Sequence, residues 1–369
     1  MNTWTFRVAA AVLGLVFIGA LGYGLTHASQ PFSSRGSGSP ALVSGPPAPE
    51  FQGIVDWENS APLRMSRLRG KVVLVDFWTY SCINCQRTFP YLRDWWHRYR
   101  SEGLVIVGVH SPEFAFEKDF GNIRKAIQRY GVEWPVAVDS NMATWTAYQN
   151  QYWPAEYLVD AHGDVRHTRF GEGGYAETER NIQTLLAAAG HKIPAGALST
   201  ATPGIGTDAD RQTAELYVGR PEFMGDPGGL MPGRPYLFID ASLDHANNLV
   251  YLAGLWTIDE TEGSEHAAHA RASSPGQDYA LINYIARRVF MVAEPARAGV
   301  RAYITLDGRD LTPASAGSDV KFDAAGHAYV DINRSDLYAL VRRGDFQHHV
   351  LKVSPVDSGF RLYTFTFGS

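Results

Sequence analysis

The chain has 369 residues, of which 45% are hydrophobic and 19% charged, so it is long enough for two domains and too apolar to be disordered throughout. Its 33 Lys and Arg residues against 38 Asp and Glu give a formal net charge of −5, which excludes the basic excess that a nucleic-acid partner requires. Only two cysteines occur, Cys82 and Cys85, which excludes a four-cysteine zinc site and a scaffold of several disulfides.

An apolar run at residues 8–25 follows a short segment that carries the amino terminus and Arg7. At about 1.5 Å per residue, a helix over this run would be about 27 Å long, close to the hydrocarbon core of a bilayer. Residues 1–28 therefore fit an uncleaved membrane anchor, which we favour, or a long signal peptide. Either one predicts that the rest of the chain lies in the cell envelope, on the periplasmic side. Residues 29–48, rich in Ser, Gly and Pro, predict a flexible linker.

Strands and helices are expected to alternate between residues 49 and 190. The predicted strands are 71–78, 104–109, 136–138, 155–159 and 165–169, and the predicted helices are 85–99, 120–130, 142–148 and 175–189. The first strand is an almost unbroken apolar run, which is typical of a strand buried on both faces. The last two strands flank a turn with Gly163, which favours a hairpin. This order predicts an α/β domain.

Residues 191–209 are rich in Pro, Gly, Ala and Thr and predict a second linker. Strand-like segments rich in aromatic and β-branched residues follow at 236–240, 249–258, 279–292, 300–306, 328–332, 350–353 and 360–367. They predict that residues 210–369 form an all-β sandwich, jelly-roll-like, that serves as a binding module. Candidate groove residues there are Glu215, Trp256, Glu260 and Asp307, against the alternative that the aromatic side chains are core.

Cys82 and Cys85 form a C-x-x-C pair directly after a predicted buried strand and at the start of a predicted helix. A cysteine at a helix N-terminus faces unpaired N–H groups, which stabilise a thiolate and lower its pKa. Cys82 is therefore the expected nucleophile, and Cys85 is the thiol that resolves a mixed disulfide. The alternative is a static disulfide. A metal site is disfavoured because the chain has no second C-x-x-C, and His266 and His269 are interpreted as solvated loop residues.

Residues 73–85 resemble the active-site strand and loop of the thioredoxin superfamily, and the sequence WTYSCINC at 78–85 is similar to its TlpA-like branch and to DipZ-type proteins. The resemblance covers residues 49–190, and the β-rich part is similar to the carbohydrate-binding-module-like domain of DipZ-type chains. It implies a thioredoxin-like fold for the α/β domain.

The same resemblance assigns roles to single residues. It implies that Asp76 is the buried acid that assists proton transfer at the resolving thiol; the alternative is a polar residue at a strand end. It implies that Pro154 is the cis-proline that faces the active site, where backbone groups pair with a substrate. Trp78 and Tyr80 either flank the site or belong to the core. Glu113 either shifts the thiol pKa values or begins a helix.

The resemblance implies an extracytoplasmic thiol–disulfide oxidoreductase without a cofactor or metal, which reduces or exchanges protein disulfides, with cytochrome c maturation as one setting. Its expected partners are protein disulfide substrates, a separate membrane electron donor of the CcdA/DsbD type, and a carbohydrate ligand of the β module. Two alternatives remain: a peroxiredoxin-like thiol peroxidase, and a non-enzymatic glycan-binding surface protein whose cysteines form a structural bridge. A resolving cysteine in the same turn disfavours the peroxidase, because peroxidatic sites usually carry a lone cysteine after Pro and Thr.

Overall fold

The structure is a computed structural model that describes residues 45–193, 198–199, 211–226, 232–242, 244–260, 268–273, 277–297, 299–356 and 358–368. The expected anchor or signal segment and most of both expected linkers lie outside these residues. Among the residues described, none of the helices combines the length and apolarity needed to cross a bilayer.

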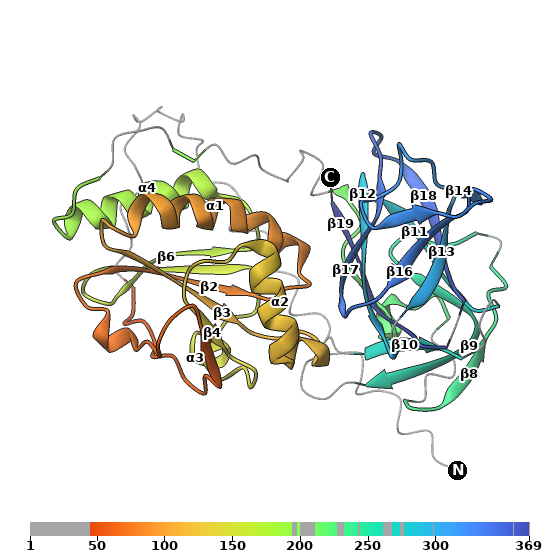
Figure 1. Ribbon diagram of the computed structural model, residues 1–369, viewed down its shortest axis with the longest axis horizontal. Helices are drawn as coiled ribbons and strands as arrows, with labels where there is room; N and C mark the ends of the chain where they lie inside the picture. The colour runs from red at the N-terminus through yellow and green to blue at the C-terminus, as the bar shows by residue number, and fades with distance from the viewer. Residues whose placement is uncertain are drawn as a thin grey trace, which may run out of the picture. The chain divides into compact units, whose positions relative to one another are not determined.

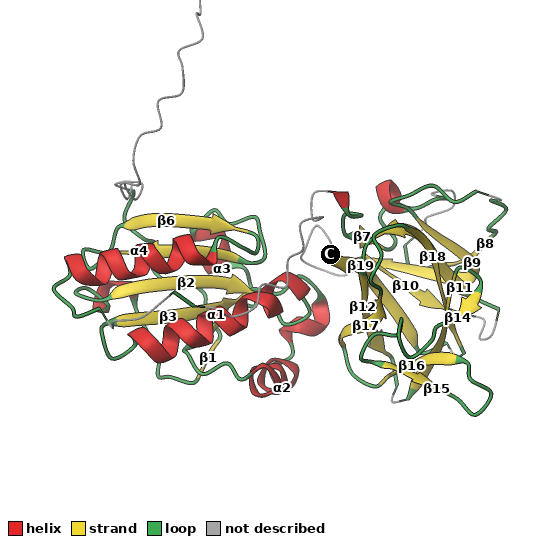
Figure 2. Ribbon diagram, turned by 90° about the horizontal axis from the view of Figure 1, so that it is seen from above, coloured by secondary structure: helices red, strands yellow, loops and turns green. Residues whose placement is uncertain are grey.

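A six-stranded sheet forms the first part of the fold, with strand order β1-β4-β3-β2-β5-β6. Its strands are β1 (Asp56–Glu58), β2 (Val72–Trp78), β3 (Leu104–His110), β4 (Val136–Val138), β5 (Ala155–Val159) and β6 (Val165–Phe170). β2, β3 and β4 are parallel, whereas β1, β5 and β6 run antiparallel to their neighbours. Figure 2 shows these strands across the sheet from β6 to β1.

Helices cover both faces of this sheet, which explains why all seven residues of β2 are buried. The α-helices in the described part of the chain are α1 (Ile83–Tyr99), α2 (Phe120–Tyr130), α3 (Ala143–Ala147) and α4 (Tyr175–Ala188). α1 and α4 lie side by side on one face (Figures 1 and 2), where they pack with Val72, Leu74 and Trp78. Val73 and Phe77 point to the opposite face, as the two-residue period of a strand requires. Asp76 therefore belongs to the face that α1 covers.

The α/β prediction is confirmed, and most element ends agree with the expected ranges within two residues. The first helix starts at Ile83, two residues earlier than expected, because Cys82 serves as its N-cap. A short strand, β1, precedes the expected first strand and pairs with β4.

A large β-sheet region follows, as expected. Its strands are β7 (Leu216–Tyr217), β8 (Pro235–Phe238), β9 (Val250–Glu260), β10 (Ala268–Ala272), β11 (Tyr279–Ile285), β12 (Arg288–Pro295), β13 (Val300–Leu306), β14 (Arg309–Asp310), β15 (Val320–Phe322), β16 (Ala328–Ile332), β17 (Asp336–Arg342), β18 (His348–Pro355) and β19 (Phe360–Gly368). The strand path is β15-β16-β13-β18-β11-β9-β10-β19-β12-β17, with β7, β8 and β14 on its sides.

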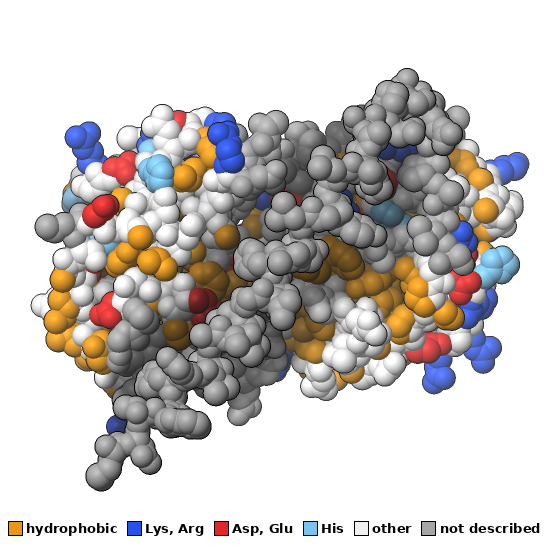
Figure 3. Space-filling view, turned by 180° about the vertical axis from the view of Figure 1, so that it is seen from behind, with side chains coloured by type: hydrophobic (Ala, Val, Ile, Leu, Met, Phe, Trp, Pro, Cys, Tyr) orange, Lys and Arg blue, Asp and Glu red, His pale blue; other side chains and the backbone are white. Residues whose placement is uncertain are grey.

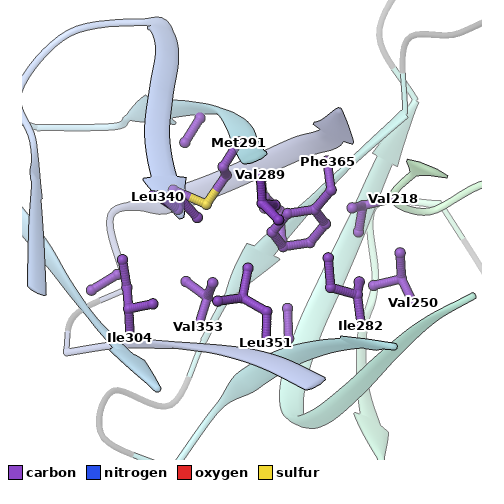
Figure 4. Close-up of a cluster of buried hydrophobic side chains, with 14 of the residues drawn as sticks. Val218, Val250, Ile282, Val289, Met291, Ile304, Leu340, Leu351, Val353 and Phe365 are labelled. Atoms are coloured by element: carbon purple, nitrogen blue, oxygen red, sulfur yellow. The ribbon is translucent and has the colours of Figure 1, made fainter. Parts of the chain in front are cut away.

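The sheet folds back on itself at β9. Residues 250–253 of this strand pair with β11, whereas residues 254–260 pair with β8 and β10. Gly254 lies at the change of partner with φ +93°, where an added Cβ would lie 2.1 Å from the Asp278 carboxylate. The resulting layers enclose an apolar core that includes Ile282, Met291 and Phe365 (Figure 4).

Two expectations for the β region are wrong. The expected single strand 279–292 is two strands, β11 and β12, which pair with different partners, because the chain bends at Ala286 and Arg287 without a Gly or Pro to mark the bend. The segment around His269, expected to be a loop, is strand β10, whereas His266 lies outside the described residues. The Ala- and Ser-rich composition conceals this strand, and its ladders with β9 and β19 stabilise it.

The α/β domain and the β region belong to one compact unit, Leu42–Ser369, and share an apolar cluster. Tyr363 of β19 packs against Phe114 and Phe116, with ring centroids 5.0 and 4.9 Å apart. Arg129 of α2 forms an ion pair with Asp336 of β17. These contacts connect the loop after β3 and helix α2 to the β region. On the described part of the face in Figure 3, blue and red side chains are dispersed and do not form one charged patch.

Candidate active site

Cys82 and Cys85 lie at the start of α1, directly after β2 and a short loop. Cys82 is the N-cap residue, and its sulfur accepts a hydrogen bond from the backbone N–H of Cys85 at 3.1 Å. Cys82 is partly exposed, Cys85 is fully buried, and the two sulfurs are not joined. The structure thus presents a dithiol in which Cys82 is the accessible sulfur.

Both thiols lie in surroundings that disfavour the thiolate. Burial raises the pKa of Cys82, and the negative charges of Glu113 and Glu215 raise it further, whereas the Cys85 N–H bond lowers it. The expected lowering of the Cys82 pKa by the helix N-terminus is therefore outweighed. Burial, the bond to Cys82 and the charge of Asp76 raise the pKa of Cys85 well above its usual value.

Asp76 is fully buried on the α1 face of the sheet, and neither carboxylate oxygen has a hydrogen-bond partner among the described residues. Burial and the charge of Glu156 raise the pKa of Asp76 well above its ordinary value. Asp76 and Glu156 are directly paired in the ladder of β2 and β5. Burial raises the pKa of Glu156 to about 7, and Thr178 of α4 donates to its carboxylate at 3.1 Å. Two acidic side chains thus lie side by side in the sheet, and the charge of one of them, Asp76, acts on Cys85.

The Trp153–Pro154 peptide bond is cis, and Pro154 is buried directly before β5. The indole N–H of Trp153 donates to the Ser111 carbonyl at 2.9 Å, which connects this turn to the loop after β3. Tyr152 is half exposed and packs on Phe170, with ring centroids 5.1 Å apart. Tyr152 and Trp153 of this turn line a pocket that also contains Cys82.

That pocket has a volume of about 190 Å³ and is lined by both parts of the chain. The α/β domain supplies Cys82, Ile83, Asn84, Glu113, Gln151, Tyr152 and Trp153, and the β region supplies Glu215, Tyr217 and Thr366. The Tyr217 hydroxyl donates to Glu113 Oε1 at 2.7 Å. Glu113 and Glu215, which sequence reasoning named for separate reasons, are therefore brought together at the sulfur.

Trp78 and Tyr80 are core side chains, both almost fully buried. The ring of Trp78 packs edge-on against Phe89 and His110, and the Tyr80 hydroxyl donates to the Phe116 carbonyl at 3.3 Å. Their positions favour the core interpretation over a direct part in the site.

Glu117 holds the loop after β3 against the C-x-x-C loop, a role that sequence reasoning missed. Its carboxylate accepts from the Ser81 hydroxyl at 2.6 Å and from the backbone N–H groups of Glu113 and Phe114 at 2.7 and 2.9 Å. Glu156 was missed as well, although a charged residue inside the apolar run of β5 is a usable signal.

The other groove candidates of the β region do not meet at one place. Trp256 is a core residue whose indole N–H donates to the Ala253 carbonyl at 2.8 Å. Asp307 lines a separate cavity of about 580 Å³ together with charged side chains such as Arg309, Asp310 and Arg342. The side chain of Glu260 lies outside the described residues. Within the described ranges no cluster of three or more His, Cys, Asp or Glu residues is arranged to hold a metal ion.

Comparisons with known proteins agree with this arrangement. Residues 44–168 match the AhpC/TSA family, and residues 213–368 match the thioredoxin like C-terminal domain family. Protein DipZ of Mycobacterium tuberculosis is 42% identical over 344 residues, which are 91% of this chain and 45% of that protein. The chain thus spans less than half the length of that relative.

Two further relatives match the α/β domain. Thiol-disulfide oxidoreductase YkuV of Bacillus subtilis is 31% identical over 141 residues, 38% of this chain and 95% of that protein. The solution structure of a thioredoxin-like protein in the oxidised form matches 39% of this chain and 97% of its own at 31% identity, with a TM-score of 0.37. With the C-x-x-C pair at the start of α1 and the match along both parts, the chain belongs to the thioredoxin-like thiol–disulfide oxidoreductases of the TlpA/DipZ type.

Proposed function

We propose that the protein reduces disulfides of extracytoplasmic proteins with the Cys82–Cys85 dithiol. The Cys82 thiolate attacks a substrate disulfide and forms a mixed disulfide, and the first substrate sulfur leaves as a thiol. Cys85 then attacks Cys82, which releases the reduced substrate and leaves a Cys82–Cys85 bond. The observation that carries this proposal is the pair itself: an accessible sulfur at the helix start with a buried thiol one turn away.

The surroundings of the two thiols support the reducing direction. A C-x-x-C protein is a strong oxidant when its reduced form is stabilised, which happens when the nucleophile is a low-pKa thiolate. Here burial and two nearby carboxylates raise the pKa of Cys82, so the thiolate gains no such stabilisation. A dithiol of this kind gives up its electrons more readily.

Asp76 and Pro154 have separate parts in the proposal. The carboxylate of Asp76, which has no hydrogen-bond partner in the part of the chain that the structure describes, takes the proton of Cys85 when that thiol attacks, since its charge acts on Cys85 and it faces α1. The turn at the cis Trp153–Pro154 bond stands beside the pocket and offers its backbone to an extended segment of the substrate.

The cellular setting forms a further part of the proposal. A membrane electron donor of the CcdA/DsbD type would regenerate the dithiol, and cytochrome c maturation would supply substrates. The apolar run at residues 8–25 would anchor the protein on the periplasmic side. For the β region we propose a carbohydrate ligand in the cavity beside Asp307, where Asp and Arg side chains offer acceptors and donors for hydroxyl groups. Titration of the purified protein with envelope polysaccharides, against an Arg342→Ala variant, tests this part.

A trapping experiment tests the main proposal. Cys85→Ala removes the resolving thiol, so mixed disulfides on Cys82 should accumulate in cells and be released by a reductant for identification. The matched control carries both Cys82→Ala and Cys85→Ala and should trap nothing. The absence of trapped proteins in the Cys85→Ala variant, at normal protein levels, would overturn the proposal.

A further inference from the structure

The β region reaches the redox site through β7. This two-residue strand pairs with β19, with Tyr217 opposite Thr364. The hydroxyl of Thr364 lies 3.1 Å from Glu215 Oε1, which fixes the carboxylate on the strand. Glu215 and Tyr217 line the same pocket as Cys82 and Glu113, although more than 100 residues separate them in sequence.

The two carboxyl groups around Tyr217 favour a shared proton. The Tyr217 hydroxyl donates to Glu113 Oε1 at 2.7 Å, and Glu215 lines the same pocket of about 190 Å³. The charge of Glu215 acts on both Glu113 and Tyr217. Two carboxylates enclosed in one small pocket repel each other, which favours a proton on one of them. The charge of Glu117 next to them adds to the like-charge repulsion that keeps a proton in place.

We propose that Glu113, Tyr217 and Glu215 form a proton-holding cluster for Cys82, so that the β region completes the redox site. The direction in which electrons pass rests on the proposed function. The cluster itself is a feature of the protein with or without a substrate.

During reduction of a substrate disulfide, the cluster accepts a proton from Cys82 and later donates it to the departing substrate sulfur. The Cys82 thiol passes its proton to a carboxylate of the cluster, and its thiolate attacks the substrate disulfide. The S–S bond of the substrate breaks, and the departing sulfur takes a proton back from the cluster. When Cys85 closes the Cys82–Cys85 bond, its proton goes to Asp76, and the second substrate sulfur leaves as a thiolate that takes a proton from solvent. Asp76 later returns its proton to solvent, so the dithiol loses two electrons and two protons in total and the substrate gains two of each.

The groups that face Cys82 define what its titration should report. They are Cys85 on α1, Glu113 on the loop after β3, and Glu215 and Tyr217 from the β region. Burial raises the pKa of Glu215 to about 7 and raises that of Glu113 well above its usual value. Glu215 is therefore already charged at the higher pH at which the Cys82 thiol ionises, so its removal should lower the pKa of Cys82.

The test is the pH dependence of iodoacetamide alkylation at Cys82, measured in the full chain with Cys85→Ala as the common background. Glu215→Gln should lower the midpoint by about half a unit to one unit, a three- to tenfold gain in thiolate below the midpoint. Tyr217→Phe should displace the inflection that the carboxyl groups contribute near neutral pH. Glu222→Gln and Tyr236→Phe, which change the same residue types on exposed parts of the β region, should leave the profile unchanged.

Profiles of Glu215→Gln and Tyr217→Phe that coincide with those controls would overturn the inference. A shift in Glu215→Gln without a change in Tyr217→Phe would overturn it as well, since the Tyr217 hydroxyl would then have no part in the cluster. Equal melting temperatures identify folded variants, and both substitutions keep the shape of the side chain. Alkylation needs no protein substrate, so a failed trapping experiment with shifted profiles would refute the proposed function alone.

Discussion

Glu156→Gln tests whether the acid that pairs with Asp76 in the sheet is held uncharged by the fold. Glu156 faces Asp76 across β2 and β5, and burial raises its pKa from 4.5 to about 7. At about 1.4 kcal/mol per unit of pKa, this rise corresponds to about 3 kcal/mol of folding free energy. Gln keeps an acceptor for the Thr178 hydroxyl and has no charge, so the variant should escape this cost.

The sign of the effect follows from which state binds the proton. Below about pH 4.5 both the folded and the unfolded chain carry the proton on Glu156, so its ionisation does not change the free energy of unfolding. Between pH 4.5 and about 7 the unfolded chain ionises while the folded chain keeps its proton, so stability falls as the pH rises. Above about pH 7 the full penalty of about 3 kcal/mol applies.

Urea unfolding of the reduced protein, followed by tryptophan fluorescence from pH 4 to pH 8, measures the effect. The stability of Glu156→Gln relative to the unsubstituted protein should rise by about 3 kcal/mol between pH 4 and pH 8. Glu177→Gln, an exposed position of α4, is the matched control and should show no such rise. A difference that stays constant with pH would refute the reasoning, because Glu156 would then be ionised in the folded chain.

Three further outcomes are expected. Asp76→Asn should slow closure of the Cys82–Cys85 bond by about 100-fold in stopped-flow oxidation, since Cys85 loses its proton acceptor; an unchanged rate would exclude that role. Glu117→Gln should destabilise the fold by about 1–3 kcal/mol in urea at pH 7, because the NH₂ group of Gln cannot accept the hydrogen bonds that one carboxylate oxygen of Glu117 accepts. Equal stability of the variant would contradict the role of Glu117 in holding the loop. Cys85→Ser should consume no more hydrogen peroxide than Cys82→Ser, whereas activity kept in Cys85→Ser alone would support the thiol peroxidase alternative.

Local pattern accounts for the parts of the fold that could be predicted. The apolar run of β2, the helical period of α2 and the glycine turn between β5 and β6 depend on neighbours in sequence, and each occurs where expected. The turn at Ala286 and Arg287 was hidden because both flanking strands are apolar and neither residue marks a turn. Strand β10 depends on its partners β9 and β19, which composition does not show.

In the candidate site too, some residues could be predicted from local sequence, whereas others depend on contacts between distant parts of the chain. Cys82 and Cys85 could be named as candidates because their short spacing is a recognisable motif, and Asp76 because a charge in a buried strand is costly. The meeting of Glu113 with Tyr217 depends on the packing of Tyr363 against Phe114, a contact between distant parts of the chain. The raised pKa of Cys82 has the same origin, since it depends on what encloses the sulfur rather than on its place at a helix start.

An equilibrium redox titration of the Cys82–Cys85 pair tests the central claim most directly. Incubation with graded ratios of oxidised and reduced dithiothreitol, followed by counting of free thiols, yields the reduction potential. A pair that serves as a reductant should lie closer to the about −270 mV of thioredoxin than to the about −120 mV of DsbA. A potential near that of DsbA would contradict the account, because the dithiol would then accept electrons from protein thiols instead of donating them.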